Sequence, residues 1–210
     1  MEIDNWRVLL IGGNSGAGKT HLAKNLVRRL GVPFLMVDDI RIALQQATTP
    51  QQHPDLHVFL KYQPEQWNHA EAIVRDWLRV GHALVKPLRD IIAHHILVES
   101  SGKIIIEGDG ILPALLNQNT FDEIPDFENI DLSQKACAVF LIEDNEDEIM
   151  RNLCKRGRGF ISASEEHQSS FVRASWQFGQ WLAQEAQRNQ ITVLKARPKE
   201  TIVERLGEVI

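Results

Sequence analysis

The sequence has little cysteine and no long apolar run. Its 210 residues include two cysteines, Cys137 and Cys154, which do not have the paired spacing of metal ligands. Such low cysteine usage favours a reducing compartment in which both thiols are packed rather than reactive. No apolar stretch approaches the length of about 20 residues that crosses a bilayer, so we expect no membrane partner.

An excess of positive charge is also missing. The formal net charge is −5, which gives no global basic field and predicts no nucleic-acid partner. The acidic N-terminal residues 1–4 lead directly into the first predicted strand. We therefore expect no secretory leader and a cytoplasmic location. The length suits one α/β domain, predicted to cover residues 1–210.

What the sequence does contain is a glycine-rich segment between a predicted strand and a predicted helix. Residues 13–20 follow the pattern G-x-x-x-x-G-K-[ST]. Its glycines let successive N–H groups point into one concavity, to which the helix adds its positive N-terminal dipole. Lys19 can reach the β- and γ-phosphates of a nucleotide, and the Thr20 hydroxyl can bind Mg²⁺. The residues predicted to bind ATP are Gly13, Asn14, Ser15, Gly16, Ala17, Gly18, Lys19 and Thr20.

Strands and helices alternate along the rest of the chain. The predicted strands cover residues 7–11, 34–37, 103–106, 136–142 and 191–194. This alternation predicts a parallel, doubly wound α/β sheet with helices on both faces. Residues 42–101 are too many for one crossover and contain two helix-like runs, 65–80, ended by Gly81, and 83–99. We interpret this stretch as a helical subdomain on the substrate side.

Asp38 and Arg41 follow the second predicted strand. Ligands of parallel sheets bind at the carboxyl ends of the strands. A carboxylate at Asp38 would lie across from the γ-phosphate and could orient or deprotonate an attacking hydroxyl. Arg41 shares the same helix face and could hold the substrate. The alternative is that Asp38 or Asp39 only caps the helix.

Glu107 and Asp109 follow the third predicted strand and are separated by Gly108. An acidic residue at this position can hold a Mg²⁺-bound water. We assign Glu107 to the metal and Asp109 to the substrate. The sequence alone does not separate these roles, and either residue could instead serve the turn.

A cluster of cations follows the fourth predicted strand. Arg151, Lys155, Arg156 and Arg158 fall within eight residues that also contain Gly157. Such a loop can close over phosphates, supply charge in the transition state and exclude water. We predict a lid over residues 151–170, with Arg151 near the nucleotide base and Arg156 and Arg158 near the phosphates. The alternative is a solvated basic helix end.

Together these motifs resemble the small-molecule P-loop kinases of the adenylate-kinase-like group. The glycine-rich segment, the stretch 38–41 and the stretch 106–108 are most similar to the branch of 2-phosphoglycerate kinases, zeta toxins and chloramphenicol phosphotransferases. The resemblance implies a three-layer fold with sheet order 2-3-1-4-5 and transfer of the γ-phosphoryl group of ATP to a hydroxyl. The Asp-Gly-Phe-Pro-Arg and Arg-x-Asp-Asp elements of nucleoside monophosphate kinases are absent from the sequence, which disfavours a mononucleotide acceptor.

The sequence therefore predicts an ATP- and Mg²⁺-dependent phosphotransferase that acts on a small molecule. Its predicted catalytic residues are Lys19, Asp38, Arg156 and Arg158. The acceptor stays open, because Arg41 suits an anion and Asp109 suits hydroxyls. An alternative from another class is a regulatory protein that binds ATP without phosphotransfer. The acceptor base and the lid disfavour it, since a sensor needs neither.

Overall fold

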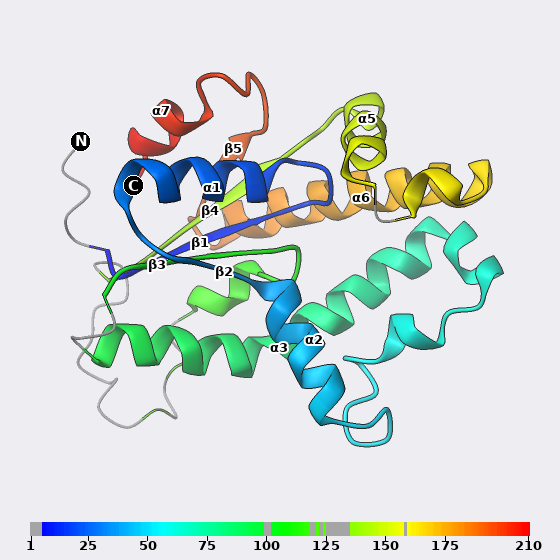
Figure 1. Ribbon diagram of the computed structural model, residues 1–210, viewed down its shortest axis with the longest axis horizontal. Coiled ribbons are helices and arrows are strands. Elements are labelled where there is room, and N and C mark those ends of the chain that lie inside the picture. Colours follow the sequence, from blue (N-terminus) through cyan, green and yellow to red (C-terminus); the bar gives the residue numbers. More distant parts are fainter. Residues whose placement is uncertain (1–5, 99–101, 118–120, 122–123, 125–134, 158) are drawn as a thin grey trace.

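Five parallel strands form one sheet in the computed structural model, which describes residues 6–98, 102–117, 121, 124, 135–157 and 159–210 (Figure 1). The strands are β1 (Val8–Gly13), β2 (Phe34–Met36), β3 (Ile104–Glu107), β4 (Ala136–Ile142) and β5 (Thr192–Lys195). Their order is β2-β3-β1-β4-β5, and every neighbouring pair is parallel. The predicted α/β P-loop fold and sheet order are confirmed.

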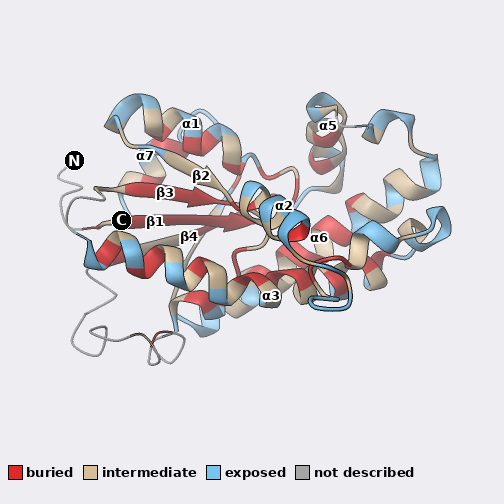
Figure 2. Cartoon of the chain, turned by 60° about the horizontal axis from the view of Figure 1, so that its bottom comes forward, coloured by how far each residue is buried: buried red, intermediate tan, exposed pale blue. Residues whose placement is uncertain are grey.

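The central strand β1 separates two apolar cores. All six of its residues are buried. Because side chains alternate along a strand, Val8 and Leu10 pack on one face of the sheet and Leu9 and Ile11 on the other. Figure 2 shows the buried strands between helices whose outer faces are exposed. The chain is thus a three-layer structure, as expected for a parallel sheet covered on both faces.

The helices are divided between the two faces. Helices α1 (Lys19–Leu30) and α7 (Ile202–Gly207) pack against Leu9 and Ile11. Helices α3 (Ala70–Leu97) and α6 (Glu165–Arg188) pack against Val8 and Leu10. The remaining elements are α2 (Val37–Ala47), α5 (Glu146–Arg156) and the short 3₁₀ helices η1 (Val58–Lys61), η2 (Pro64–Asn68), η4 (Pro113–Leu116) and η6 (Phe160–Ser162).

Helix α3 corrects one prediction. A helix end at Gly81 is wrong, because a single helix of 28 residues runs through both Gly81 and Pro87. Gly81 is buried, and a Cβ atom there would lie 2.9 Å from the Leu112 side chain. The glycine therefore permits close packing within a continuous helix. Residues 65–68 belong to η2, not to the long helix.

The strand ends converge at one edge of the sheet. Strand β2 stops at Met36, which places Asp38 and Asp39 in the first turn of α2. Glu107 ends β3, and the glycine-rich loop joins β1 to α1. The same edge therefore carries the motifs that the sequence singled out. None of the helices in the described ranges is long and apolar enough to cross a membrane.

Candidate functional site

The glycine-rich loop adopts a conformation that its glycines make possible. Gly13 has a φ of 140°, and a Cβ there would lie 2.0 Å from the Leu141 carbonyl oxygen. Gly18 precedes the first residue of α1 and has a φ of 94°, in the left-handed region that glycine tolerates best. These backbone requirements explain why glycine occupies both positions of the motif.

Buried side chains fix the loop to the rest of the fold. The Asn14 amide donates a hydrogen bond to the Glu143 carbonyl (3.1 Å) and accepts one from the Glu143 N–H (3.1 Å). The Ser175 hydroxyl, on α6, donates to the Ser15 carbonyl (2.7 Å). Asn14, which the sequence predicted to bind ATP, is fully buried, and its side chain supports the loop. The cavity beside the loop is lined by residues 16–20.

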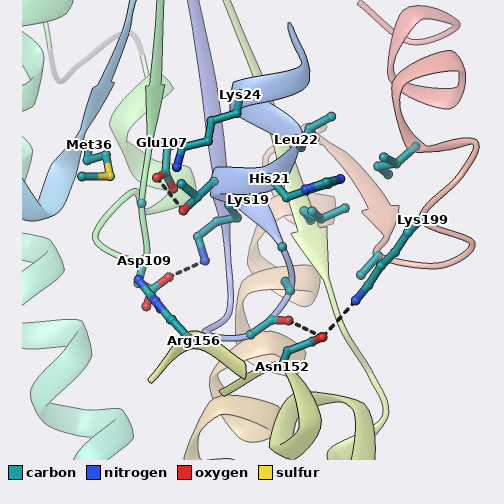
Figure 3. Close-up of a pocket in the computed structure, with 18 of the residues that line it drawn as sticks. Lys19, His21, Leu22, Lys24, Met36, Glu107, Asp109, Asn152, Arg156 and Lys199 are labelled. Atoms are coloured by element: carbon teal, nitrogen blue, oxygen red, sulfur yellow. Dashed lines mark hydrogen bonds and ion pairs between the residues drawn. The ribbon is translucent and has the colours of Figure 1, made fainter. Parts of the chain in front are cut away.

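A cavity of about 520 Å³ surrounds the loop and the start of α1 (Figure 3). Its volume lies within the range of about 300–1,000 Å³ that is typical of ligand sites. Beside the loop it is lined by Asp38, Glu107 and Asp109 from the strand ends and by Arg156 from α5. The structure thus brings most of the sequence-predicted residues to one cavity.

Lys19 projects into this cavity and already has an anionic partner. Its Nζ donates to the Asn14 carbonyl (2.8 Å) and forms an ion pair with Asp109, which also accepts a hydrogen bond from the Ser15 hydroxyl (2.9 Å). Burial alone would raise the pKa of Asp109, but Lys19, with smaller contributions from Arg156 and Ser15, lowers it below its ordinary value. Asp109 was assigned to the substrate, and in the structure it pairs with Lys19, the residue predicted to contact the phosphates.

Thr20 and Glu107 form another polar contact in the cavity (Figure 3). The Thr20 hydroxyl donates to Glu107 Oε1 at 2.8 Å. Burial of Glu107 raises its pKa above the ordinary value, because it outweighs the opposing effects of Lys19 and of the Thr20 hydrogen bond. A hydroxyl and a carboxylate are hard oxygen donors of the kind Mg²⁺ prefers, so this pair fits the predicted metal position.

Asp38 and Arg41 lie on one face of α2, as their spacing predicts. Arg41 pairs with Asp38 at 3.2 Å and donates a hydrogen bond to Gln45 Oε1 at 3.3 Å. The Asp38 side chain keeps 44% of its surface exposed and lines the nucleotide cavity. Asp38 therefore lies both in the first turn of α2 and at the edge of the cavity.

A second cavity of about 290 Å³ adjoins the first. Asp38, Asp109 and Arg156 line both cavities. Arg41 lines only the second. Its remaining lining is rich in aromatic side chains, including Trp67 and Trp77.

The cations of the predicted lid have separate positions. Arg156 lines both cavities. Arg151 instead forms an ion pair with Glu148, one helical turn before it, and lines neither cavity. The structure thus does not bring Arg151 to the nucleotide. Arg158 lies outside the described residues.

Sequence reasoning missed Asn152 and Lys199, which line the first cavity on the side away from Met36 (Figure 3). The Asn152 amide donates to the Gly16 carbonyl (2.8 Å), and Lys199 donates to Asn152 Oδ1 (2.9 Å). Burial, with the neighbouring charge of Arg197, lowers the pKa of Lys199. Lys199 follows β5, so the strand-end rule would have found it.

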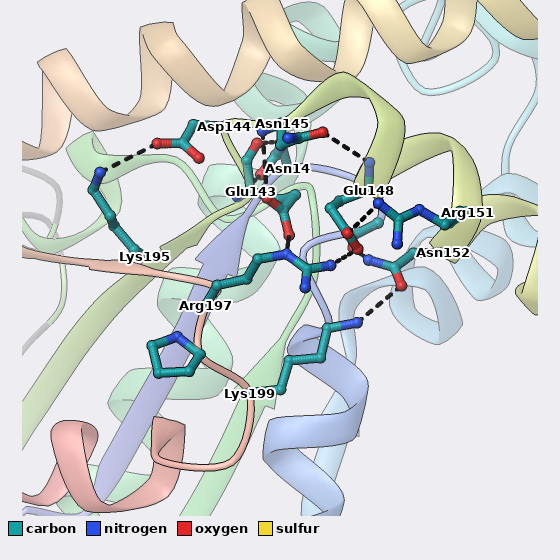
Figure 4. Close-up of polar contacts among 12 residues, drawn as sticks. Asn14, Glu143, Asp144, Asn145, Glu148, Arg151, Asn152, Lys195, Arg197 and Lys199 are labelled. Atoms are coloured by element: carbon teal, nitrogen blue, oxygen red, sulfur yellow. Dashed lines mark hydrogen bonds and ion pairs between the residues drawn. The ribbon is translucent and has the colours of Figure 1, made fainter.

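The segment after β5 is held by buried charges. Arg197 donates to the buried carboxylate of Glu143 at 3.0 Å and also forms an ion pair with Glu148 on α5 (Figure 4). Glu143 is the residue whose backbone contacts Asn14. One network therefore connects the phosphate loop, the end of β4 and the segment that carries Lys199.

Comparisons with known proteins agree with this geometry. A family model described as an AAA domain matches residues 8–86, from β1 into α3. A shikimate kinase from Bacteroides thetaiotaomicron is similar in structure, with 19% identity, a TM-score of 0.50 and 96% of each chain covered. A sugar kinase from a Janibacter species shows 17% identity and a TM-score of 0.50, with 96% of this chain and 92% of that chain covered.

A deoxyadenosine kinase from M. mycoides with bound dATP shows 14% identity and a TM-score of 0.48, with 96% of this chain and 97% of that chain covered. No curated protein sequence matches the chain. At these identities the structural likeness shows the fold alone. The chain has an α/β P-loop fold, which implies nucleotide binding, and it has distant structural similarity to small-molecule kinases.

Proposed function

We propose that the chain is an ATP- and Mg²⁺-dependent phosphotransferase that moves the γ-phosphoryl group of ATP to a hydroxyl of a small molecule. One observation carries the proposal. The cavity around the phosphate loop adjoins a second cavity, and both are lined by Asp38, Asp109 and Arg156. A donor phosphate and an acceptor hydroxyl can therefore meet beside a carboxylate and a guanidinium group.

The donor nucleotide is held by backbone dipoles and one buried charge. The N–H groups of the loop and the N-terminus of α1 attract the phosphates. Lys19 leaves Asp109 and contacts the β- and γ-phosphates as a point charge. Asn152 and Lys199 line the far side of the cavity, where the nucleoside would lie.

Thr20 and Glu107 would hold Mg²⁺, directly or through water. Their oxygen atoms are 2.8 Å apart, and Glu107 is 4% exposed. Bound Mg²⁺ supplies positive charge that offsets the charge of the β- and γ-phosphate oxygens. The high pKa of Glu107 matches a carboxyl group that is built to sit beside a cation.

Asp38 and the cations beside it serve the acceptor. The acceptor oxygen forms a bond to the γ-phosphorus while the bond from that phosphorus to the bridging oxygen of ADP breaks, and the hydroxyl proton passes to Asp38. Arg41 positions the Asp38 carboxylate through their ion pair. Arg156 lies beside the transferring group and stabilises its negative charge.

A coupled assay of ADP release with Mg²⁺ and ATP, across a panel of hydroxylated metabolites, tests the proposal. We expect release that depends on one class of acceptor and disappears in Lys19→Ala. Tight ATP binding with no acceptor-dependent release across the panel would instead support a regulatory protein that binds ATP without phosphotransfer.

A further inference from the structure

We propose that the acceptor is an uncharged molecule in which a flat aromatic or heteroaromatic ring carries the reactive hydroxyl on a short arm. The inference rests on the proposed phosphotransferase function and names its substrate class. The ring would bind against an aromatic wall, defined as the side chains of Phe59, Trp67, Trp77, Phe160 and Phe171, all of which line the second cavity.

The members of the aromatic wall contact one another across distant parts of the chain. Trp67 of η2 stacks on Phe59 of η1, with ring centroids 5.5 Å apart and an interplanar angle of 16°. Phe171 of α6 meets Trp77 of α3 edge-on at 5.1 Å and Phe160 at 5.8 Å. Trp67 and Phe171 lie 6.3 Å apart. The rings therefore form one connected cluster beside the second cavity, and a ligand ring there can add stacked or edge-to-face contacts to it.

The wall is held in place before any ligand arrives. Asp76 of α3 is 2% exposed, accepts a hydrogen bond from the Tyr62 hydroxyl at 2.6 Å and pairs with Arg79 at 3.1 Å. These bonds fix the segment from η1 to η2 on α3. The Ser170 hydroxyl donates to the Asn68 carbonyl at 3.0 Å and joins η2 to α6. A preformed surface binds its ligand without a further cost of ordering side chains.

The charged residues of the second cavity are the three that it shares with the phosphate cavity and Arg41, which pairs with one of them, Asp38. The three residues that line both cavities, Asp38, Asp109 and Arg156, are charged, and the five wall residues line the second cavity alone. Together with Arg41, these residues give the second cavity two carboxylates and two guanidinium groups, whose formal charges sum to zero. A highly anionic acceptor would be repelled by both carboxylates and would leave the aromatic wall without a partner. An uncharged molecule can place its ring on the wall and its polar arm beside the charged residues.

The volume limits the size of the acceptor. About 290 Å³ lies just below the range of about 300–1,000 Å³ for ligand pockets. It suits one ring system with a hydroxylated arm and is too small for a lipid chain or a folded peptide.

Matched ligand pairs test the inference in the full-length protein without ATP. Calorimetry compares phenyl β-glucoside with methyl β-glucoside and thymidine with deoxyribose, so that the two members of a pair differ in the ring. We expect the ring-bearing member of at least one pair to bind about tenfold or more tightly than its partner, as ring stacking of about 1.4 kcal/mol would give.

Two variants locate the preference, and a third controls for general damage. Trp67→Leu and Phe171→Leu each remove one ring from the wall while keeping an apolar side chain, and we expect each to reduce the preference about tenfold. Trp181→Leu is the matched control, because Trp181 stacks on Phe178 at 6.2 Å and lines neither cavity. Circular dichroism confirms that each variant is folded. If both wall variants unfold, the affinities of the wild-type protein for the ring-bearing and ring-free members of each ligand pair still test the inference.

Three results overturn the inference: equal or tighter binding of the ring-free members, no binding of any ring-bearing member at about 1 mM, or a ring preference that survives in both folded wall variants. Failure of the proposed function looks different. A ring preference without acceptor-dependent ADP release would contradict phosphotransfer and leave the ligand class standing. ADP release with glycerate or gluconate, but with no ring-bearing alcohol, would support phosphotransfer and contradict the proposed ligand class.

Discussion

The two adjoining cavities are built from different parts of the chain. The phosphate cavity uses the backbone of one continuous loop and charges carried on strand ends. The second cavity adds side chains from η1, η2 and α3 and side chains from η6 and α6, two groups of elements that are far apart in sequence. The first arrangement suits a group that every nucleoside triphosphate shares, and the second suits a partner that differs between proteins. Each prediction below alters one side of this comparison.

The largest expected effect comes from the phosphate side. Lys19→Ala removes the charge that contacts the β- and γ-phosphates, and we expect phosphoryl transfer to fall about 1,000-fold or more. Steady-state ADP release with the best acceptor measures the loss. The affinity for that acceptor without ATP should fall much less, because Lys19 does not line the second cavity.

Lys86→Ala is the control for Lys19→Ala. Lys86 is exposed on α3 and lines neither cavity, so its removal should leave turnover within twofold of wild type, about 0.4 kcal/mol in the barrier. Wild-type turnover in folded Lys19→Ala would remove the lysine from the proposed mechanism.

Asp38→Asn tests the boundary between the cavities. The amide keeps the size of the side chain and loses the proton-accepting charge, so we expect turnover to fall about 100-fold or more while ATP still binds. Asp39→Asn provides a neighbouring control, because Asp39 is exposed in the same helical turn and lines neither cavity. Equal effects of the two substitutions would show that Asp38 has no special role in transfer.

Gly179→Ala disturbs the support of the phosphate loop from α6. The added Cβ would lie 2.9 Å from Asn14 Cγ. Overpacking of this kind costs about 1–3 kcal/mol, and we expect a lower free energy of unfolding in urea together with weaker ATP binding. Gln184→Ala, at an exposed position of the same helix, should change neither quantity. Unchanged ATP affinity in Gly179→Ala would mean that the loop tolerates movement of Asn14.

The smallest expected effect concerns pH. The pKa of Glu107 is raised above its ordinary value of 4.5, so the folded protein holds this proton more tightly than the unfolded chain. The contribution of Glu107 to the free energy of unfolding therefore falls as pH rises from 4.5 through the folded pKa. The glutamine in Glu107→Gln does not titrate, so this contribution to the free energy of unfolding should not change with pH in the variant.

Urea unfolding of Glu107→Gln and wild type, without nucleotide or metal, at a series of pH values from 4.5 to neutrality measures this effect. The variant should gain stability relative to wild type across this window. Asp109 has a lowered pKa and affects stability in a more acidic range, below its ordinary value of 3.8, so it does not disturb the comparison. A difference that stays constant with pH would contradict the raised pKa.

The phosphate side was predictable because its information is local. The loop motif fixes a backbone shape within eight consecutive residues, and Asp38 and Arg41 meet because they are three residues apart on one helix. Local rules failed where packing decides. Glycine and proline usually interrupt helices, yet Gly81 and Pro87 lie inside α3, where Gly81 gives room to Leu112.

Other features of the site depend on contacts that the sequence motifs do not indicate. The buried Asn14 side chain contacts Glu143 and Ser175, which lie 129 and 161 residues away, and no local sequence pattern predicts these contacts. Arg151 was assigned to the nucleotide as one of a run of cations, but the turn of α5 directs it to Glu148. The aromatic wall combines residues from two distant stretches, 59–77 and 160–171, that no motif in the sequence connects. Their shared cavity appears once α3 and α6 pack together.

The contact between Lys19 and Asp109 has a consequence for the binding and release of nucleotides. Every nucleotide must replace the carboxylate, so the affinities of both ATP and ADP are reduced by the free energy of that ion pair. When ADP departs, the lysine recovers a partner instead of being left buried and unpaired. Under the proposed function, the carboxylate competes with ATP and ADP alike for this ammonium group, so it weakens the binding of both nucleotides and leaves the ratio of their affinities unchanged.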